Sequence, residues 1–262
     1  MRHRIRPPAV AGLFYPAQPD VLAALVDRLV AAGRPEGPPP AALVVPHAGY
    51  EYSGPVAGVA YARVAARRGV VKRVVMLGPA HRVWLRGSAV SGADGFDTPL
   101  GTVEIDDELR RRALACAEVV VNDAAHAREH AIEVQLPFLQ RVLGAVRVLP
   151  VVVGDATTAE VAAILDRVWG GPETLIVVSS DLSHYLDHAT ATTHDRRTAA
   201  AIVARMPERV GDDDACGARP IRGLLAVARR RGLDVRLLDL RTSADTAGDS
   251  ERVVGYGAFA VG

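Results

Sequence analysis

The chain has 262 residues, of which 49% are hydrophobic, and its 31 basic and 30 acidic side chains leave a formal net charge of +1. This length suits one large domain with a deep core, so we expect a single domain over residues 1–262. The balanced charge excludes the basic surface of a protein that binds nucleic acid or an anionic membrane.

The sequence also limits where the protein acts. The N-terminus is basic, but Pro7 and Pro8 stand where the apolar stretch of a signal peptide would begin. The apolar runs are far shorter than the roughly 20 residues that span a bilayer. Two cysteines, Cys116 and Cys216, are too few for a disulfide framework in a chain of this length. We therefore expect a cytoplasmic protein with two free thiols and no membrane segment.

Short apolar runs rich in β-branched residues alternate with helical patterns along the chain. Because the runs are apolar on both faces, they are typical of buried parallel strands. The predicted strands cover 42–45, 73–77, 148–153 and 174–179, and the predicted helices cover 20–32, 55–68, 106–116, 132–143, 158–169 and 189–205. The first helix has Asp20 as its predicted N-cap and Gly33 as its end. This alternation predicts an α/β layered fold with a central, mostly parallel sheet flanked by helices.

Two regions depart from this alternation. Residues 87–105 contain alternating stretches at 88–91 and 102–105 around a turn-rich middle, which predicts an antiparallel hairpin insertion. Residues 235–240 and 253–261 are predicted to be two further strands that pair at a sheet edge. Cys116 falls in the last turn of a predicted amphipathic helix, so we interpret it as a small buried hydrophobic residue.

Residues that carry chemistry follow three of the predicted strands. His47 comes after the strand 42–45, His81 after 73–77, and both Asp181 and His184 after 174–179. Because the carboxyl ends of parallel strands meet at one edge of a sheet, these side chains are expected to converge there. Glycine and proline beside the two histidines favour tight turns that hold the imidazoles firmly.

Seven short motifs occur in order and resemble the signature of the Memo family. They are RPPAVAGLFYP at 6–16, PHAGYEYSG at 46–54, GPAH at 78–81, TPLG at 98–101, EHAIEVQLP at 129–137, SSDLSH at 179–184 and CG at 216–217. The resemblance implies a fold like that of the class III extradiol dioxygenases, which hold non-haem iron at one end of a central sheet.

The resemblance also implies the site residues. His47, His81 and Cys216 would bind the metal, Asp181 and His184 would be catalytic, and Tyr15, Tyr52 and His130 would contact the substrate. Two imidazoles and a thiolate suit iron, copper or zinc, and we expect iron(II), with copper or zinc as alternatives. The expected function is that of a metal-binding redox or dioxygenase-like enzyme acting on a small molecule or a peptide.

Cysteine is the departure from the dioxygenase pattern. The dioxygenases have a carboxylate where the Memo family has this residue, so ring cleavage is not expected here. Asp212, Asp213 and Asp214 precede Cys216 and could supply a carboxylate, but we interpret them as a surface acidic run. Without a metal, Cys216 would be an alternative nucleophile paired with His184 or His81.

Other functions remain open at this point. A non-catalytic metal-binding module, or a peptide or phosphopeptide-binding module, would use Tyr15, Tyr50 and Tyr52 as its groove and Arg82 or Arg219 against an anion. Prokaryotic family members are associated with a radical-SAM protein and an AMMECR-type protein, which the resemblance implies as partners.

A zinc hydrolase is the third alternative. The histidines and glutamate of residues 126–130 match the H-x-x-E-H motif, but the residues before His126 are interpreted as a loop. The sequence contains no nucleotide-binding glycine motif and no G-x-S-x-G nucleophile elbow.

Overall fold

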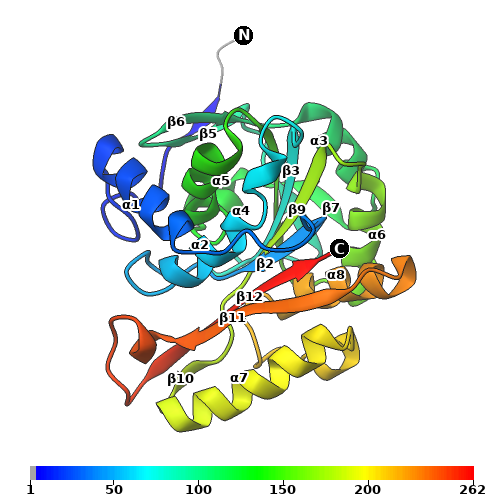
Figure 1. Ribbon diagram of the computed structural model, residues 1–262. Helices are drawn as coiled ribbons and strands as arrows, with labels where there is room; N and C mark the ends of the chain where they lie inside the picture. Colours follow the sequence, from blue (N-terminus) through cyan, green and yellow to red (C-terminus); the bar gives the residue numbers. More distant parts are fainter. Residues whose placement is uncertain (1–3) are drawn as a thin grey trace.

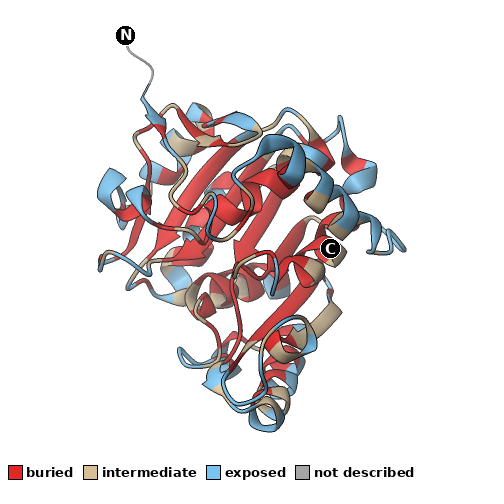
Figure 2. Cartoon of the chain, turned by 90° about the vertical axis from the view of Figure 1, so that its left-hand side faces the viewer, coloured by how far each residue is buried: buried red, intermediate tan, exposed pale blue. Residues whose placement is uncertain are grey.

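The computed structural model describes residues 4–262, which form helices packed on both faces of a large mixed sheet (Figure 1). In its centre lie four adjacent parallel strands, β2 (Ala42–Val45), β9 (Thr174–Ser179), β3 (Arg73–Pro79) and β8 (Arg147–Val153). These are the four strands that apolar runs predict, and nearly all their residues are buried (Figure 2). The predicted layered α/β fold with a mostly parallel centre is confirmed.

Alternate residues of each central strand enter two separate cores. On β2, Leu43 and Val45 face one core, whereas Ala42 and Val44 face the other. The helices of the first core are α1 (Pro19–Ala31), α2 (Gly54–Ala62) and α5 (Leu136–Leu143). Those of the second are α3 (Asp107–Leu114), α6 (Thr158–Val168), α7 (His188–Val203) and α8 (Ala218–Arg231). Both faces of the sheet are therefore covered, which is why its strands are apolar throughout.

Several predicted helix boundaries are wrong for local reasons. Helix α1 begins at Pro19 with Gln18 as N-cap, because proline suits the first helical position, so Asp20 is not the cap. The predicted helix 55–68 is split into α2 and a 3₁₀ turn, η1 (Ala65–Arg67). In that turn the buried Arg67 guanidinium donates to the carbonyls of Pro40, Pro172 and Thr174. Similarly, a 3₁₀ turn, η2 (Glu133–Gln135), precedes α5.

The hairpin insertion exists, but one of its predicted strands belongs elsewhere. Strands β5 (Gly95–Thr98) and β6 (Gly101–Glu104) form the antiparallel hairpin. Strand β1 (Ile5–Arg6) pairs with β5, and the three strands make a small separate sheet. Residues 88–91 instead contribute β4 (Ser88–Val90), which joins the large sheet beside β8 and β7 (Val119–Val121). All three residues of β4 are buried, so both faces of this strand are covered.

The C-terminal strands pair as predicted, antiparallel, as β11 (Val235–Thr242) and β12 (Val253–Val261). Strand β12 also pairs with β2 and with the short β10 (His184–Leu186), so only β11 lies at the edge. The remaining elements are α4 (Asp123–Ala127), η3 (Pro207–Arg209) and η4 (Ser243–Asp245). Within residues 4–262 no helix is both long enough and apolar enough to cross a membrane.

Two segments differ from their sequence interpretation. Helix α8 is not predicted, although Gly232 in the left-handed conformation ends it as a typical C-cap. Cys116 lies two residues beyond α3 and is half-buried against the second core, so it is less enclosed than expected.

Candidate metal centre

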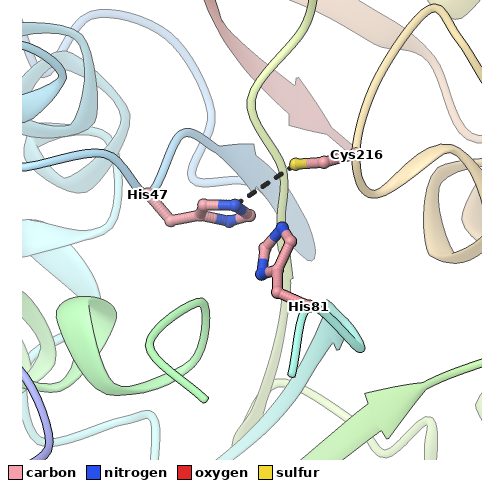
Figure 3. A group of neighbouring side chains, drawn as sticks. All are labelled: His47, His81 and Cys216. Atoms are coloured by element: carbon pink, nitrogen blue, oxygen red, sulfur yellow. Dashed lines mark hydrogen bonds between the residues drawn. The ribbon is translucent and has the colours of Figure 1, made fainter. Parts of the chain in front are cut away.

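Two loops at one edge of the sheet, together with the segment before α8, bring the predicted metal ligands together. His47 lies two residues beyond β2 and His81 two residues beyond β3, while Cys216 directly precedes the N-cap of α8. The donor atoms of these three side chains all lie within 4.8 Å of one another. Cys216 Sγ is 3.2 Å from His47 Nε2, and the His81 ring lies beside this pair (Figure 3).

His47 is held from two sides inside the protein. Its backbone N–H donates to Asp181 Oδ1 at 2.7 Å, and its Nδ1 lies 3.0 Å from Ser179 Oγ. Burial, together with the nearby charge of His81, lowers the pKa of His47 to about 3, so its imidazole is neutral at physiological pH. Burial also raises the pKa of Asp181, whose carboxylate lies 3.9 Å from His47 Nε2.

Glu129 orients His81. Its carboxylate accepts the backbone N–H of His81 at 2.7 Å and lies 2.9 Å from His81 Nδ1. Burial alone would raise the pKa of Glu129, but hydrogen bonds from His81, the charge of His81 and the amide of Ala131 hold it at about 2. Because an ionised carboxylate can only accept, the neutral form of His81 carries its proton on Nδ1 and its lone pair on Nε2.

The position of Cys216 depends on a close approach between two backbone segments, at Gly217 and Ser180. Its Sγ accepts the N–H of Asp181 at 3.3 Å, and Gly217 N–H donates to Ser180 Oγ at 2.9 Å. A Cβ at Gly217 would lie 2.6 Å from Cβ of Ser180, so only glycine allows this approach. Burial and the charge of Asp181 raise the pKa of the Cys216 thiol, which therefore keeps its proton in the metal-free protein.

His130 is the third imidazole of the cluster. Its ring stacks on that of His81, with centroids 4.8 Å apart, and stands perpendicular to that of His47. Among the described residues its buried Nδ1 has no hydrogen-bond partner. Burial and the charge of His47 lower the pKa of His130 to about 4. Donor atoms of His81, Glu129 and His130 also lie within 4.8 Å of one another, so His81 belongs to both groups.

The other predicted site residues lie further out. His184 begins β10, close enough for its charge to lower the pKa values of His47 and Asp181. Tyr52 is 38% exposed near the site, whereas Tyr15 is only 3% exposed. The Tyr15 hydroxyl donates to Glu133 Oε1 at 2.7 Å, which makes Tyr15 a structural contact in the core.

Beside Cys216 a cavity of about 240 Å³ opens between two loops and the start of α8. The exposed Trp84 and the half-buried Arg219 lie on its walls, and Arg219 pairs with Asp155 and Asp212. This cavity gives a small molecule access to the sulfur side of the cluster.

The zinc-hydrolase arrangement is contradicted. His126 lies in α4, not in a loop, and its buried Nε2 is 3.0 Å from the carbonyl of Ala89. Within the described part of the chain, neither group of donor atoms includes His126. The acidic run also stays outside, because Asp212 pairs with Arg219 and Arg222, and Asp214 with His194.

Sequence reasoning misses the residues that support the ligands. Glu129 and Ser179 appear in it only as parts of motifs. Gln135 has no predicted role, although it donates to Ser179 Oγ at 2.8 Å. The only sequence signal is their position inside the motifs at 129–137 and 179–184.

Comparison with known proteins identifies the family of this chain. The sequence profile described as Memo-like protein matches residues 6–260. A MEMO1 family protein of Methanopyrus kandleri is 38% identical, covering 97% of this chain and 98% of its own. Relatives from Aquifex aeolicus and Thermotoga maritima are each 36% identical, covering 97% and 96% of this chain, and 97% of their own lengths.

Among solved structures, an uncharacterized protein of Escherichia coli K12 has a similar fold, with a TM-score of 0.56 and 12% identity. The match covers 84% of this chain and 99% of that one, and at this identity it bears on the fold alone. The profile match over nearly the whole length, and relatives above 30% identity, show that this chain belongs to the Memo family.

Proposed function

We propose that this protein binds a redox-active metal ion through His47, His81 and Cys216 and acts as an oxidoreductase on a small molecule or a peptide. The observation that carries the proposal is the convergence of two imidazole nitrogens and one sulfur within 4.8 Å. They come from three separate segments at the sheet edge where α/β proteins bind their ligands.

The donor set decides which ions fit. Ligand atoms 2.0–2.3 Å from a tetrahedral ion are about 3.3–3.8 Å apart. Cys216 Sγ and His47 Nε2, 3.2 Å apart, lie just below this range, and the 27% exposed His81 side chain has room to approach them. Two nitrogens and a sulfur suit iron, copper or zinc, whereas magnesium and calcium prefer oxygen ligands. We propose iron(II) as the resident ion, with copper or zinc as alternatives.

A bound iron or copper ion would supply one-electron chemistry, and this chain's residues would prepare its surroundings. Asp181 holds the backbone of His47, and we propose that Asp181 and His184 hold and move protons at the substrate. His130 and Tyr52 are the proposed substrate contacts, because both have exposed surface near the cluster. The cavity of about 240 Å³ beside Cys216 is the proposed entrance for a small substrate.

The proposal extends to surroundings and partners. A ferrous or cuprous ion bound to a cysteine thiolate needs a reducing compartment, so we propose the cytoplasm as the site of action. The radical-SAM protein and AMMECR-type protein implied by the family resemblance are proposed partners.

Metal binding is tested by anaerobic purification and separate reconstitution with ferrous, cuprous and zinc ions. Wild type should bind one ion per chain, and His47→Ala, His81→Ala and Cys216→Ser should each lose it. Cys116→Ser is the matched control, because this second thiol lies outside both donor groups in the described chain. Unchanged stoichiometry in all three ligand variants would remove the proposed site.

Enzymatic function needs a separate assay. Oxygen consumption by the iron form is followed with catechols and with small-molecule cell extract. Consumption that Cys216→Ser abolishes supports an oxidoreductase. A silent metal site together with tight peptide binding would instead favour the binding module.

A further inference from the structure

Behind His47 runs a buried chain of hydrogen bonds that none of the proposed roles uses. Tyr61 donates its hydroxyl to Gln135 Oε1 at 2.9 Å. Gln135 Nε2 donates to the carbonyl of Pro46 at 2.9 Å and to Ser179 Oγ at 2.8 Å. Ser179 Oγ in turn donates to the carbonyl of Ala131 at 2.6 Å. The Nδ1 atom of His47 lies 3.0 Å from this Ser179 Oγ.

Two backbone carbonyls fix the direction of every bond in this chain. The carbonyl of Pro46 can only accept, so the amide nitrogen of Gln135, and not its oxygen, must face it. The carbonyl of Ala131 can also only accept, so it takes the single proton of the Ser179 hydroxyl. Ser179 Oγ then has only lone pairs left for Gln135 and for His47.

His47 Nδ1 must therefore be the donor to Ser179 Oγ. A neutral imidazole carries one proton, so Nε2 of His47 has the lone pair, and this is the atom that lies 3.2 Å from Cys216 Sγ. The opposite tautomer would place two lone pairs 3.0 Å apart between two buried side chains, which is unfavourable.

We propose that Gln135 and Ser179 are positioning residues that keep the proton of His47 on Nδ1 and so present Nε2 to the metal ion. The inference rests on the proposed metal site for its purpose, but the tautomer itself is a property of the metal-free protein. Glu129 performs the same task for His81 by a different device, an ionised carboxylate. The two imidazoles are thus oriented independently. Neutral hydrogen bonds through Gln135 and Ser179, here called the relay, orient His47, and the ionised carboxylate of Glu129 orients His81.

The residues of the relay come from two of the sequence motifs. Gln135 and Ala131 lie in the motif at 129–137, and Ser179 begins the motif at 179–184. Gln135 is 1% exposed and Ser179 is fully buried, so neither can touch a substrate from this position. Through Ser179 Oγ they act on one nitrogen of one ligand, Nδ1 of His47.

The direct test is two-bond ¹⁵N–¹H correlation of the histidine side chains in metal-free protein. Wild-type His47 should show a protonated Nδ1 and a bare Nε2. Ser179→Ala and Gln135→Met should each shift His47 toward the Nε2–H form and weaken metal binding by about 10- to 100-fold. Ser88→Ala is the matched control, because this buried serine hydroxyl has no partner among the described residues.

The outcomes separate the relay from the metal site. A wild-type His47 protonated on Nε2, or variants in which both tautomer and metal affinity stay unchanged, would overturn the relay. Wild type that binds no metal would overturn the proposed function, whereas a tautomer shift in the metal-free variants still supports the relay. If Gln135→Met does not fold, Ser179→Ala alone decides, because it removes the oxygen that accepts the His47 Nδ1 proton.

Discussion

Replacing Arg6 by Met should destabilise the protein strongly, because it leaves a buried carboxylate without its countercharge. Arg6 Nη1 lies 2.6 Å from Glu133 Oε2, and the two side chains are 6% and 0% exposed. Glu133 also accepts the N–H groups of Ala9 and Val10 and the hydroxyl of Tyr15, so its carboxylate cannot turn outward to water.

The magnitude follows from the burial of the pair. Removing one partner of a buried ion pair costs about 3–5 kcal/mol. For a chain of this size each kcal/mol lowers Tm by about 2–4 °C, so Arg6→Met should lower Tm by roughly 6–20 °C. Arg4→Met is the matched control, because its pair with Asp123 is largely exposed at 67% and 49% and should contribute at most about 1 kcal/mol.

The assay is thermal and denaturant unfolding of both variants beside wild type. Arg6 also donates to the carbonyls of His126 and Glu129, so its loss should loosen the segment that orients His81 and weaken metal binding as well. If Arg6→Met and Arg4→Met unfold within about 1 kcal/mol of each other, the buried pair does not stabilise the fold as argued.

Three further predictions concern the pH dependence of stability, the close backbone approach at Gly217 and the carboxylate of Glu129. Burial lowers the pKa of His126 to about 4, so the unfolded chain binds more protons at this residue below pH 6.5, and His126 alone should lower stability by up to about 3 kcal/mol between pH 6.5 and pH 4. His126→Gln should flatten that slope in metal-free unfolding curves, and an unchanged slope would contradict this reasoning. Gly217→Ala should cost about 1–3 kcal/mol and weaken metal binding, while Gly49→Ala, whose added Cβ meets nothing closer than 3.6 Å, should be nearly neutral in the same titrations. Glu129→Gln should lower metal affinity by about tenfold or more, and equal affinity by competition titration would exclude Glu129 from orienting His81.

The central sheet is predictable from sequence because its signal is local. Val74 to Leu77 and Leu175 to Val178 are buried on both faces, and a continuous apolar run is the direct mark of such a strand. The positions of His47 and His81 are predictable from the same signal, because residues that directly follow a parallel strand lie at the carboxyl edge of the sheet. The predictions fail where neighbours far along the chain decide, as for β4, which pairs with β8 rather than within the hairpin.

The supporting residues of the site are beyond a sequence argument for the same reason. Ser179 and Gln135 are 44 residues apart, and their bond exists only because η2 packs behind the end of β9. Helix α8 is a different omission, since its apolar residues and the C-cap Gly232 are visible locally. The many arginines of α8 make its helical spacing of apolar residues hard to recognise in the sequence. In the structure, Ile221, Leu224 and Leu225 of this helix point into the second core.

Cys216 lies 169 residues after His47, so the two atoms that stand 3.2 Å apart are joined by most of the chain. No excised peptide can reproduce this constellation, and an unfolded chain offers the ion only scattered ligands. An ion held there would therefore act as a ligand of the native state alone and, at a hundred times its Kd, would favour that state by about 2.7 kcal/mol. Metal supply would then govern how much of this protein survives in a cell, apart from any reaction it performs.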